Sequence, residues 1–434
     1  MGGVNYPFVF LLGFPNFTKF MNKQERIILT LLASLNFTHI LDFMIMMPLG
    51  NYLNVTAMQF SILVASYSIA AFFSGLGIAM FIDRFDRKKF LLFAYIGFVI
   101  GTIACGFAPT YGMLLGARIV AGLFGGIIGA QVLSIVADMF SYERRGRAMG
   151  AVMGGFAAAS ILGVPISLYL TNLFKHDWHV PFLLIGALGI IFIPLIIRFI
   201  PSMTAHIKER KAEEVSSPFS VLVNVCKIPE QRSALIFSCL LMMGHFLIIP
   251  FINPYLEYNK GFSKDHTPMI YLVGGMASLL AALYLGKLSD KRGKLAVFSV
   301  SVFLSLFMVL IITRMPNVPF GIVLLFFAIW FTVATGRIVT AQAMISEVVK
   351  PERRGSFMSV NGSIQQLGSG LAALFAGMIV VTEKSGKVHN YNWVGYLSIF
   401  VLLLSLLFGR RIFKKIDVSD DTPIAEKELV QETA

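Results

Sequence analysis

Two ionisable residues lie inside long apolar runs, Asp42 in the run at 27–50 and Arg118 in the run at 112–137. A charge at bilayer depth costs roughly 2.5–3.5 kcal/mol on insertion scales, so such residues are functional candidates. At about 1.5 Å per helical residue, they lie roughly 12 Å and 9 Å from the same end of their helices and could pair. A carboxylate that leaves and rejoins such a pair can carry protons. The alternative is a permanent structural ion pair.

Two histidines extend this site. His39 lies one turn before Asp42 on the same helix face, and His245 follows it by 206 residues. Because histidine titrates near neutral pH, His39 joins Asp42 and Arg118 as a proton-coupling candidate. The alternative is that both histidines are hydrogen-bonding packing residues.

Arg337 is a second cation inside an apolar run, and the second half of the chain offers it no embedded acid. It either attracts an anionic group of a substrate or pairs across a central cavity. We expect the remaining cavity positions to be polar. With Arg337, the candidates are Asn36, Gln131, His245, Asn253, Gln342, Asn361 and Gln365.

Composition sets the class of protein that must position these residues. Of 434 residues, 56% are hydrophobic and 14% are charged, whereas a soluble domain is about a quarter charged. Twelve apolar runs are long enough to cross a bilayer. They lie near 27–50, 59–82, 90–108, 112–137, 147–173, 181–200, 233–256, 268–287, 295–313, 319–346, 355–381 and 392–413.

The chain is also duplicated. The segment Asp138–Gly146 returns as Glu347–Gly355, where Glu-Arg-Arg-Gly recurs after 209 residues. The sequence therefore predicts an all-α membrane protein with twelve transmembrane helices in two pseudo-twofold-related six-helix bundles, an architecture typical of secondary transporters. The predicted divisions are an N-terminal segment at 1–22, bundles at 23–200 and 231–416, a cytoplasmic linker at 201–230, and an acidic cytoplasmic tail at 417–434.

The net charge of +13 is distributed asymmetrically. Most Lys and Arg residues fall in loops and tails on one side of the predicted membrane. The other side holds Lys175, Lys260, Lys264, Arg314, Lys384 and Lys387. The positive-inside rule then places both termini in the cytoplasm of a multi-pass protein, which we assign to a bacterial inner membrane. Basic residues spread over separate loops do not indicate nucleic-acid binding.

Enzymatic chemistry has no support in the sequence. The three cysteines lack metal-ligand spacing, and no G-x-x-x-x-G-K-[ST] phosphate loop is present. We expect no enzyme, no cofactor and no metal.

Several motifs resemble those of a known family. The loops at 83–88 and, more fully, 286–294 carry the pattern G-x-L-a-D-r-x-G-r-k, and Arg118-x-x-x-Gly122 and Gly163-Val-Pro165 follow in the first half. Residues 23–415 thereby resemble the major facilitator superfamily, within it the twelve-helix drug:proton antiporters of the arabinose- and sugar-efflux-like branch. Asp86 stands where the first loop usually has glycine. Asp177 and His179 depart from the G-W-R-x-x-F pattern of that branch, so a sugar substrate does not follow.

The duplicated loops suggest a cytoplasmic gate. Asp83 and Asp290 end the second and eighth helices, where they can accept N–H bonds from helix starts near Gly355 and Gly146 of the opposite half. The alternative is ordinary anchoring by basic loops. The gate residues are Asp83, Arg84, Arg87, Glu143, Arg144, Asp290, Arg292, Glu352 and Arg353.

These observations favour proton-coupled efflux of a small organic molecule, such as a drug or sugar, by alternating access. The alternative is a uniporter or proton symporter for a small metabolite. A membrane sensor on the same scaffold is disfavoured by complete gate motifs in both halves. The partners expected are the substrate, protons and the bilayer, and a monomer is the simplest expectation.

Overall fold

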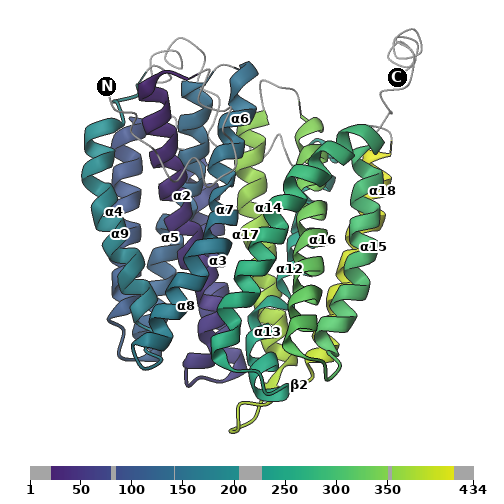
Figure 1. Ribbon diagram of the computed structural model, residues 1–434. Coiled ribbons are helices and arrows are strands. Elements are labelled where there is room, and N and C mark those ends of the chain that lie inside the picture. The colour runs from purple at the N-terminus through teal and green to yellow at the C-terminus, as the bar shows by residue number, and fades with distance from the viewer. Residues whose placement is uncertain (1–20, 80–84, 141, 205–226, 350–353, 415–434) are drawn as a thin grey trace, which may run out of the picture.

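The computed structural model describes residues 21–79, 85–140, 142–204, 227–349 and 354–414. Residues 1–20 of the predicted N-terminal segment, most of the predicted linker and the acidic tail therefore lie outside the described residues. Two parallel sets of membrane helices stand side by side (Figure 1). The end at which the first helix begins and the last helix ends is called the terminal face, and the other end the opposite face.

The six helices of the first half occupy residues 23–199. They are α2 (Lys23–Leu49), α3 (Ala57–Ala79), α4 (Arg87–Gly106), α5 (Tyr111–Met139), a fifth helix in the pieces α6 (Tyr142–Met153), α7 (Gly155–Ala158), η4 (Ala159–Gly163) and α8 (Val164–Leu173), and α9 (Val180–Phe199).

The second half repeats this order. Its helices are a seventh in the pieces α12 (Pro229–Phe246), α13 (Ile249–Pro254) and η5 (Tyr255–Asn259), then α14 (Thr267–Arg292), α15 (Lys294–Thr313), α16 (Phe320–Glu347), α17 (Arg354–Ile379) and α18 (Tyr391–Phe413). Eleven of the described helices are long and apolar enough to span a membrane. The more polar α17 is the twelfth, so the predicted fold class is confirmed.

The first helix begins earlier than predicted, at Lys23 rather than near residue 27. The reason is a capping box: the Asn22 side chain accepts from the Glu25 amide at 2.7 Å, and the Glu25 carboxylate accepts from the Asn22 amide at 3.1 Å. Reciprocal capping satisfies amides that the first helical turn leaves free. A hydropathy pattern omits this polar first turn.

Two membrane helices are broken near prolines. In the fifth helix the π-helical turn η4 precedes Pro165, which is the second residue of α8. In the seventh, α12 ends before Pro250, and the π-helical turn η5 follows Pro254. Proline removes a backbone donor and clashes with the preceding turn, which explains the breaks. Pro48, by contrast, lies one residue before the end of α2 and does not interrupt it.

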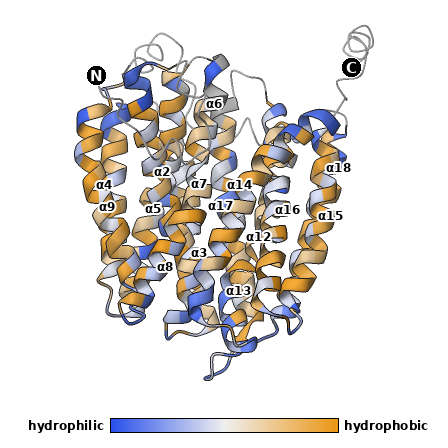
Figure 2. Cartoon of the chain, in the orientation of Figure 1, coloured by the Kyte–Doolittle hydropathy of each residue, from blue (hydrophilic) through white to orange (hydrophobic). Residues whose placement is uncertain are grey.

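Several pairs of helices join the two bundles. The helix α3 packs against α17, α14 packs against α8 and η4, and α2 packs against α13. Hydrophilic residues gather at the two faces and hydrophobic residues cover the middle (Figure 2). A short hairpin, β1 (Val381–Thr382) and β2 (Val388–His389), joins α17 to α18 at the opposite face (Figure 1).

Candidate functional site

The predicted ion pair is present inside the first bundle. Arg118 on α5 contacts the Asp42 carboxylate on α2, with Nη1 and Oδ2 2.7 Å apart, and neither side chain is exposed. The same nitrogen lies 3.3 Å from the Asp42 carbonyl oxygen. Two opposite charges removed from water offset each other only with close geometry and further hydrogen bonds. The geometry of this pair is close, and the Nε and Nη2 atoms of Arg118 have no hydrogen-bond partner among the described residues.

Two further side chains complete the environment of the pair. Thr102 on α4 donates its hydroxyl to Asp42 Oδ1 at 3.1 Å. The Arg118 guanidinium lies 4.4 Å from the centre of the Tyr67 ring on α3, a cation–π distance. Both carboxylate oxygens of Asp42 therefore have a donor. Thr102 and Tyr67 do not stand out in the sequence, because threonine and tyrosine are common in membrane helices and only the fold brings these two to the ion pair.

Glycines on α5 make this close assembly feasible. A Cβ atom at Gly122 would lie 2.4 Å from the Tyr67 carbonyl oxygen, and one at Gly125 would lie 2.4 Å from the Tyr67 hydroxyl. Small residues let membrane helices approach closely. The motif Arg118-x-x-x-Gly122 thus supplies a charge and, one turn later, the space in which α3 lies beside that charge.

His39 is buried one turn from Asp42, but no hydrogen bond joins the two in the described structure. Its ring lies 6.3 Å from Tyr67 and 6.2 Å from Phe98, centre to centre. Neither ring nitrogen has a hydrogen-bond partner in the described part of the chain. The predicted proton-coupling role of His39 stays a prediction.

The second bundle holds a different pair. Arg337 on α16 donates from Nη2 to His245 Nδ1 on α12 at 3.2 Å, and the His245 ring stacks on Trp330 at 5.3 Å. All three side chains are at most 9% exposed. The sequence analysis selected Arg337 and His245 separately, and it missed both their contact and Trp330.

The predicted amide positions are scattered through both bundles. Asn36 donates to the Val152 carbonyl oxygen at 3.0 Å, beside the break in the fifth helix. The other partners run between neighbouring helices of the second bundle: Asn253 with Tyr271 at 3.4 Å, Asn361 with Gln342 at 3.4 Å, and Gln365 with Ser238 at 3.1 Å. Gln131 is fully buried, and its amide has no partner among the described residues.

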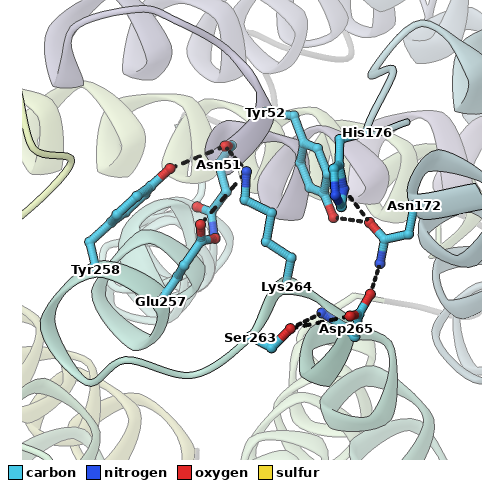
Figure 3. Close-up of polar contacts among 9 residues, drawn as sticks. All are labelled: Asn51, Tyr52, Asn172, His176, Glu257, Tyr258, Ser263, Lys264 and Asp265. Atoms are coloured by element: carbon cyan, nitrogen blue, oxygen red, sulfur yellow. Dashed lines mark hydrogen bonds and ion pairs between the residues drawn. The ribbon is translucent and has the colours of Figure 1, made fainter. Parts of the chain in front are cut away.

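The opposite face carries a polar network that joins the bundles (Figure 3). Asn51, just past the end of α2, donates to Glu257 of η5 at 2.6 Å. Lys264 and Tyr258 both donate to the Asn51 carbonyl oxygen, at 3.0 and 3.4 Å. Asn172 of α8 donates to Asp265 at 2.8 Å. We call these six residues the outer network.

The sequence analysis missed the outer network, although the repeat contained a signal for it. Asn51-Tyr52 and Glu257-Tyr258 are separated by the same 206 residues as His39 and His245. Equivalent positions near the pseudo-twofold axis are the ones that can meet. A search of the repeat for complementary polar pairs would have selected Asn51 and Glu257.

At the terminal face, the repeat instead forms equivalent ion pairs within each bundle. Arg87 Nε lies 2.9 Å from Asp138 Oδ2, and Lys294 Nζ lies 2.7 Å from Glu347 Oε1. Arg144 pairs with Glu25 at 3.3 Å, again within the first bundle.

The other predicted gate residues divide into two groups. Asp290 and Arg292 are exposed at the end of α14, with no hydrogen bond or ion pair to any residue that the structure describes. Asp83, Arg84, Glu352 and Arg353, and the Glu143 side chain, lie outside the described residues. The gate stays a prediction.

The two copies of the loop motif turn by different means. Gly293 adopts a φ of 86° between α14 and α15, a conformation open to glycine. At the equivalent position Asp86 has an ordinary φ of −59° and caps α4 by accepting from the Lys88 amide at 3.0 Å. Asp86 also accepts from the Ser202 hydroxyl at 2.5 Å and the Met203 amide at 3.0 Å, which fixes the chain after α9.

Proteins of similar sequence are membrane transporters. The chain is 23% identical over 351 residues to the MFS-type transporter YceJ of Bacillus subtilis (strain 168), covering 79% of this chain and 86% of YceJ. It is 25% identical over 383 residues to the putative transporter AraJ of Escherichia coli (strain K12), covering 85% and 89%.

Solved structures share the fold. A bacterial homologue of the human lysosomal transporter Spinster, in an inward-facing and unoccupied conformation, aligns with a TM-score of 0.72 at 15% identity, over 92% of this chain and 100% of that one. A D-xylose–proton symporter aligns with a TM-score of 0.66 at 15% identity, over 88% and 97%.

A family model described as the Major Facilitator Superfamily matches residues 27–337 and 234–432. With two six-helix bundles and these relatives, the chain belongs to the major facilitator superfamily of membrane transporters.

Proposed function

We propose that this protein exports a small organic molecule in exchange for protons, with Asp42 as the proton carrier. The observation that carries the proposal is the fully buried pair of Asp42 and Arg118, 2.7 Å apart and each seven residues from the end of its helix at the opposite face. A buried ion pair that only braced the fold could be replaced as a whole by apolar packing at little cost. A carboxylate paired with an arginine and a hydroxyl can instead exist in two states.

The exchange follows from those two states. In one state Asp42 is charged and bound by Arg118 and Thr102. In the other, Asp42 holds a proton and Arg118 loses its counter-charge, leaving the guanidinium over the Tyr67 ring. If each state of the pair favours a different arrangement of the bundles, proton binding and substrate binding become coupled through one free energy. Proton entry then drives export.

The outer network supports alternating access. Its hydrogen bonds hold the bundles together at the opposite face. The Lys264–Glu257 ion pair, with Nζ and Oε1 3.6 Å apart, joins two residues of the second half and positions them for these bonds. We assign the terminal face to the cytoplasm of a bacterial inner membrane, because the basic loops lie there. In this assignment the described conformation is closed to the outside, and a monomer suffices for the cycle.

Export rather than uptake is favoured by the Gly163-Val-Pro165 motif, which coincides with the break at η4 and α8. The motif resembles that of the efflux branch of the family. The similarity to AraJ, a putative transporter, is compatible with this choice. The likeness to the D-xylose–proton symporter is one of fold alone.

Inside-out vesicles containing the protein test the proposal. A pH-sensitive dye reports proton release as candidate drugs, sugars and nucleosides are added singly to energised vesicles. We expect substrate-triggered proton leak with the natural protein and none with Asp42→Asn. The matched control is Asp177→Asn, the same chemical change at a half-exposed loop carboxylate, which should behave like the natural protein.

Two results would contradict the proposal. Substrate flux that persists unchanged in Asp42→Asn would make the pair a structural element. Substrate-triggered proton movement of the opposite sign would indicate symport. Thermal unfolding of each variant shows whether a loss of flux reflects a loss of fold.

A further inference from the structure

Arg337 is a buried cation whose counter-charge is missing from its bundle. It lies mid-way along α16, ten residues before Glu347, and is 1% exposed. Arginine stays protonated in proteins and can only donate hydrogen bonds. Its Nε and Nη1 atoms have no partner among the described residues. A buried charge left unpaired is strongly unfavourable, so something outside this side-chain set has to compensate it.

The acids of the second bundle are placed elsewhere. Within residues 227–349 and 354–414 every carboxylate lies at a helix end or in a loop. They are Glu230, Glu257, Asp265, Asp290, Glu347 and Glu383. The acid inside the first bundle, Asp42, is already bound to Arg118. No described side chain therefore supplies the missing negative charge.

The neighbours of Arg337 are donors as well. Because Arg337 donates to Nδ1 of His245, that ring is neutral and carries its proton on Nε2. Trp330, two turns before Arg337 on the same helix face, stacks on His245. Its indole Nε1 is buried and has no partner among the described residues. Arg337 and Trp330 thus present N–H groups beside the His245 ring, which carries an N–H group of its own.

The first bundle shows that this arrangement is specific to the second. A shift of 209 residues, the spacing of Asp138 and Glu347, places Arg337 opposite Ile128. There, glycines rather than a cation approach the equivalent histidine: a Cβ at Gly125 would lie 2.9 Å from His39 Cδ2. The duplication kept the histidine in both halves, and only the second half has a cation against it.

We infer that Arg337, His245 and Trp330 form a binding subsite for an anionic group of the transported molecule, either a carboxylate or a phosphate-like or sulfonate group. That this molecule is transported rests on the proposed function, whereas the subsite itself is defined by binding. The anion supplies an acceptor for the unpartnered Nε and Nη1 atoms of Arg337 and the Nε1 atom of Trp330. In this arrangement Asp42 couples transport to protons in the first bundle, and Arg337 recognises the anion in the second.

Binding measurements on the full-length protein in lipid nanodiscs test the subsite without any gradient. The probes are benzoate, phenylphosphonate and benzenesulfonate at constant chloride, with benzamide as the neutral isostere of benzoate. Tryptophan fluorescence and thermal unfolding report binding. We expect at least one anion to bind about tenfold more tightly than benzamide, as charged hydrogen bonds allow. The preferred probe distinguishes carboxylate from phosphate-like groups.

Variants localise the effect. Arg337→Gln should lose the preference for anions over benzamide, and Arg337→Lys should keep most of it. Trp330→Phe should weaken anion binding and leave benzamide binding unchanged. Binding to Trp330→Phe is measured by thermal unfolding, because this variant lacks the reporting tryptophan. Arg314→Gln, the same change in the turn before α16, is the matched control. Without ligand, Arg337→Gln should unfold at an equal or higher temperature, because it removes an uncompensated charge. Equal binding of all anions and benzamide, or undiminished anion preference in Arg337→Gln, would overturn the inference.

The result of the binding experiment can be distinguished from the result of the proton-release experiment. Asp42→Asn should bind the anionic probe as the natural protein does. Anion binding without proton exchange would leave the subsite intact and remove the proposed coupling. Proton exchange with no anion preference would support the proposed coupling and remove the subsite.

Discussion

Asn51 and Glu257 occupy equivalent positions in the two halves of the chain, 206 residues apart, and hydrogen-bond to each other at 2.6 Å. A residue can meet its own repeat only beside the pseudo-twofold axis. The contact therefore marks where that axis leaves the opposite face. The two residues differ in type, since Asn51 donates and Glu257 accepts. The two copies of this duplicated position are therefore complementary to each other.

Removing the charge at this contact should open the opposite face. In Glu257→Gln the bond from Asn51 becomes neutral, so closure weakens by about 1 kcal/mol, the difference between a charged and a neutral hydrogen bond. The ion pair with Lys264, which lies within the second half, is lost as well. Spin labels at Lys175 and Asn317, both exposed, would report a larger fraction of long distances.

The control for this experiment is Glu383→Gln. Glu383 bonds to His389 and Ser385 within the hairpin, so its neutralisation leaves the bundles joined. Label distances that stay unchanged in Glu257→Gln, or that lengthen equally in Glu383→Gln, would rule out the outer network as a closing device.

Asp42 and Arg118 should be energetically coupled. Arg118→Gln leaves the Asp42 carboxylate buried without its partner, which costs about 3–5 kcal/mol. Adding Asp42→Asn removes the isolated charge and should recover much of the lost stability. Thermal unfolding of the two single variants and the double variant gives the coupling. Additive effects of the two changes would show that the pair contributes little beyond its separate side chains.

Gly122 and Gly116 on α5 should respond oppositely to the same substitution. A Cβ at Gly122 meets the backbone of Tyr67, with 2.4 Å to its carbonyl oxygen, so Gly122→Ala forces α3 and α5 apart at a cost of about 1–3 kcal/mol. Nothing lies within 4 Å of a Cβ at Gly116, and alanine there should be neutral or slightly stabilising. The melting temperatures of the two variants test this difference. Equal decreases in melting temperature would refute the packing explanation.

Asp86 should stabilise the protein only where it is ionised. Its partial burial opposes ionisation, but hydrogen bonds from Ser202, Met203 and Lys88 together with the nearby Lys89 charge outweigh burial and lower the pKa of Asp86. A carboxyl with a lowered pKa stabilises the fold fully above its unfolded pKa of about 3.9 and loses that contribution as pH falls through the folded pKa.

The loss of the Asp86 cap is therefore visible at neutral pH and vanishes in acid. Asp86→Ala should cost about 1 kcal/mol at pH 7, typical of an N-cap. The difference in melting temperature between the two proteins should stay level down to about pH 4 and then shrink. A difference that grows below pH 4 would contradict this assignment.

Hydropathy and charge predicted the fold well, because a bilayer imposes one length and one polarity on every crossing segment. The pairing of Asp42 with Arg118 was predictable for the same reason: depth follows from helical rise, and buried charges need partners. The start of α2 at Lys23 and the breaks at η4 and η5 depend on local capping and proline geometry, which hydropathy does not record.

The contacts that were missed depend on helix rotation. Depth places Thr102 and Tyr67 near Asp42, but only the packing of α3 and α4 turns their side chains toward it. The meeting of Arg337 with His245 likewise needs the relative rotation of α16 and α12. Sequence periodicity gives the faces of one helix, not the angle at which two helices present them.

The polar character of α17 bears on how the chain enters the membrane. This helix carries Asn361, Ser363, Gln365 and Gln366 along a length that other helices fill with apolar residues. A translocon that partitions each segment by its own hydropathy would retain α17 poorly. Since α17 packs against α3 of the first half, its stable residence in lipid depends on a bundle synthesised some 300 residues earlier. Expression of the second half alone should therefore yield a chain that exposes α17 to quality-control proteases.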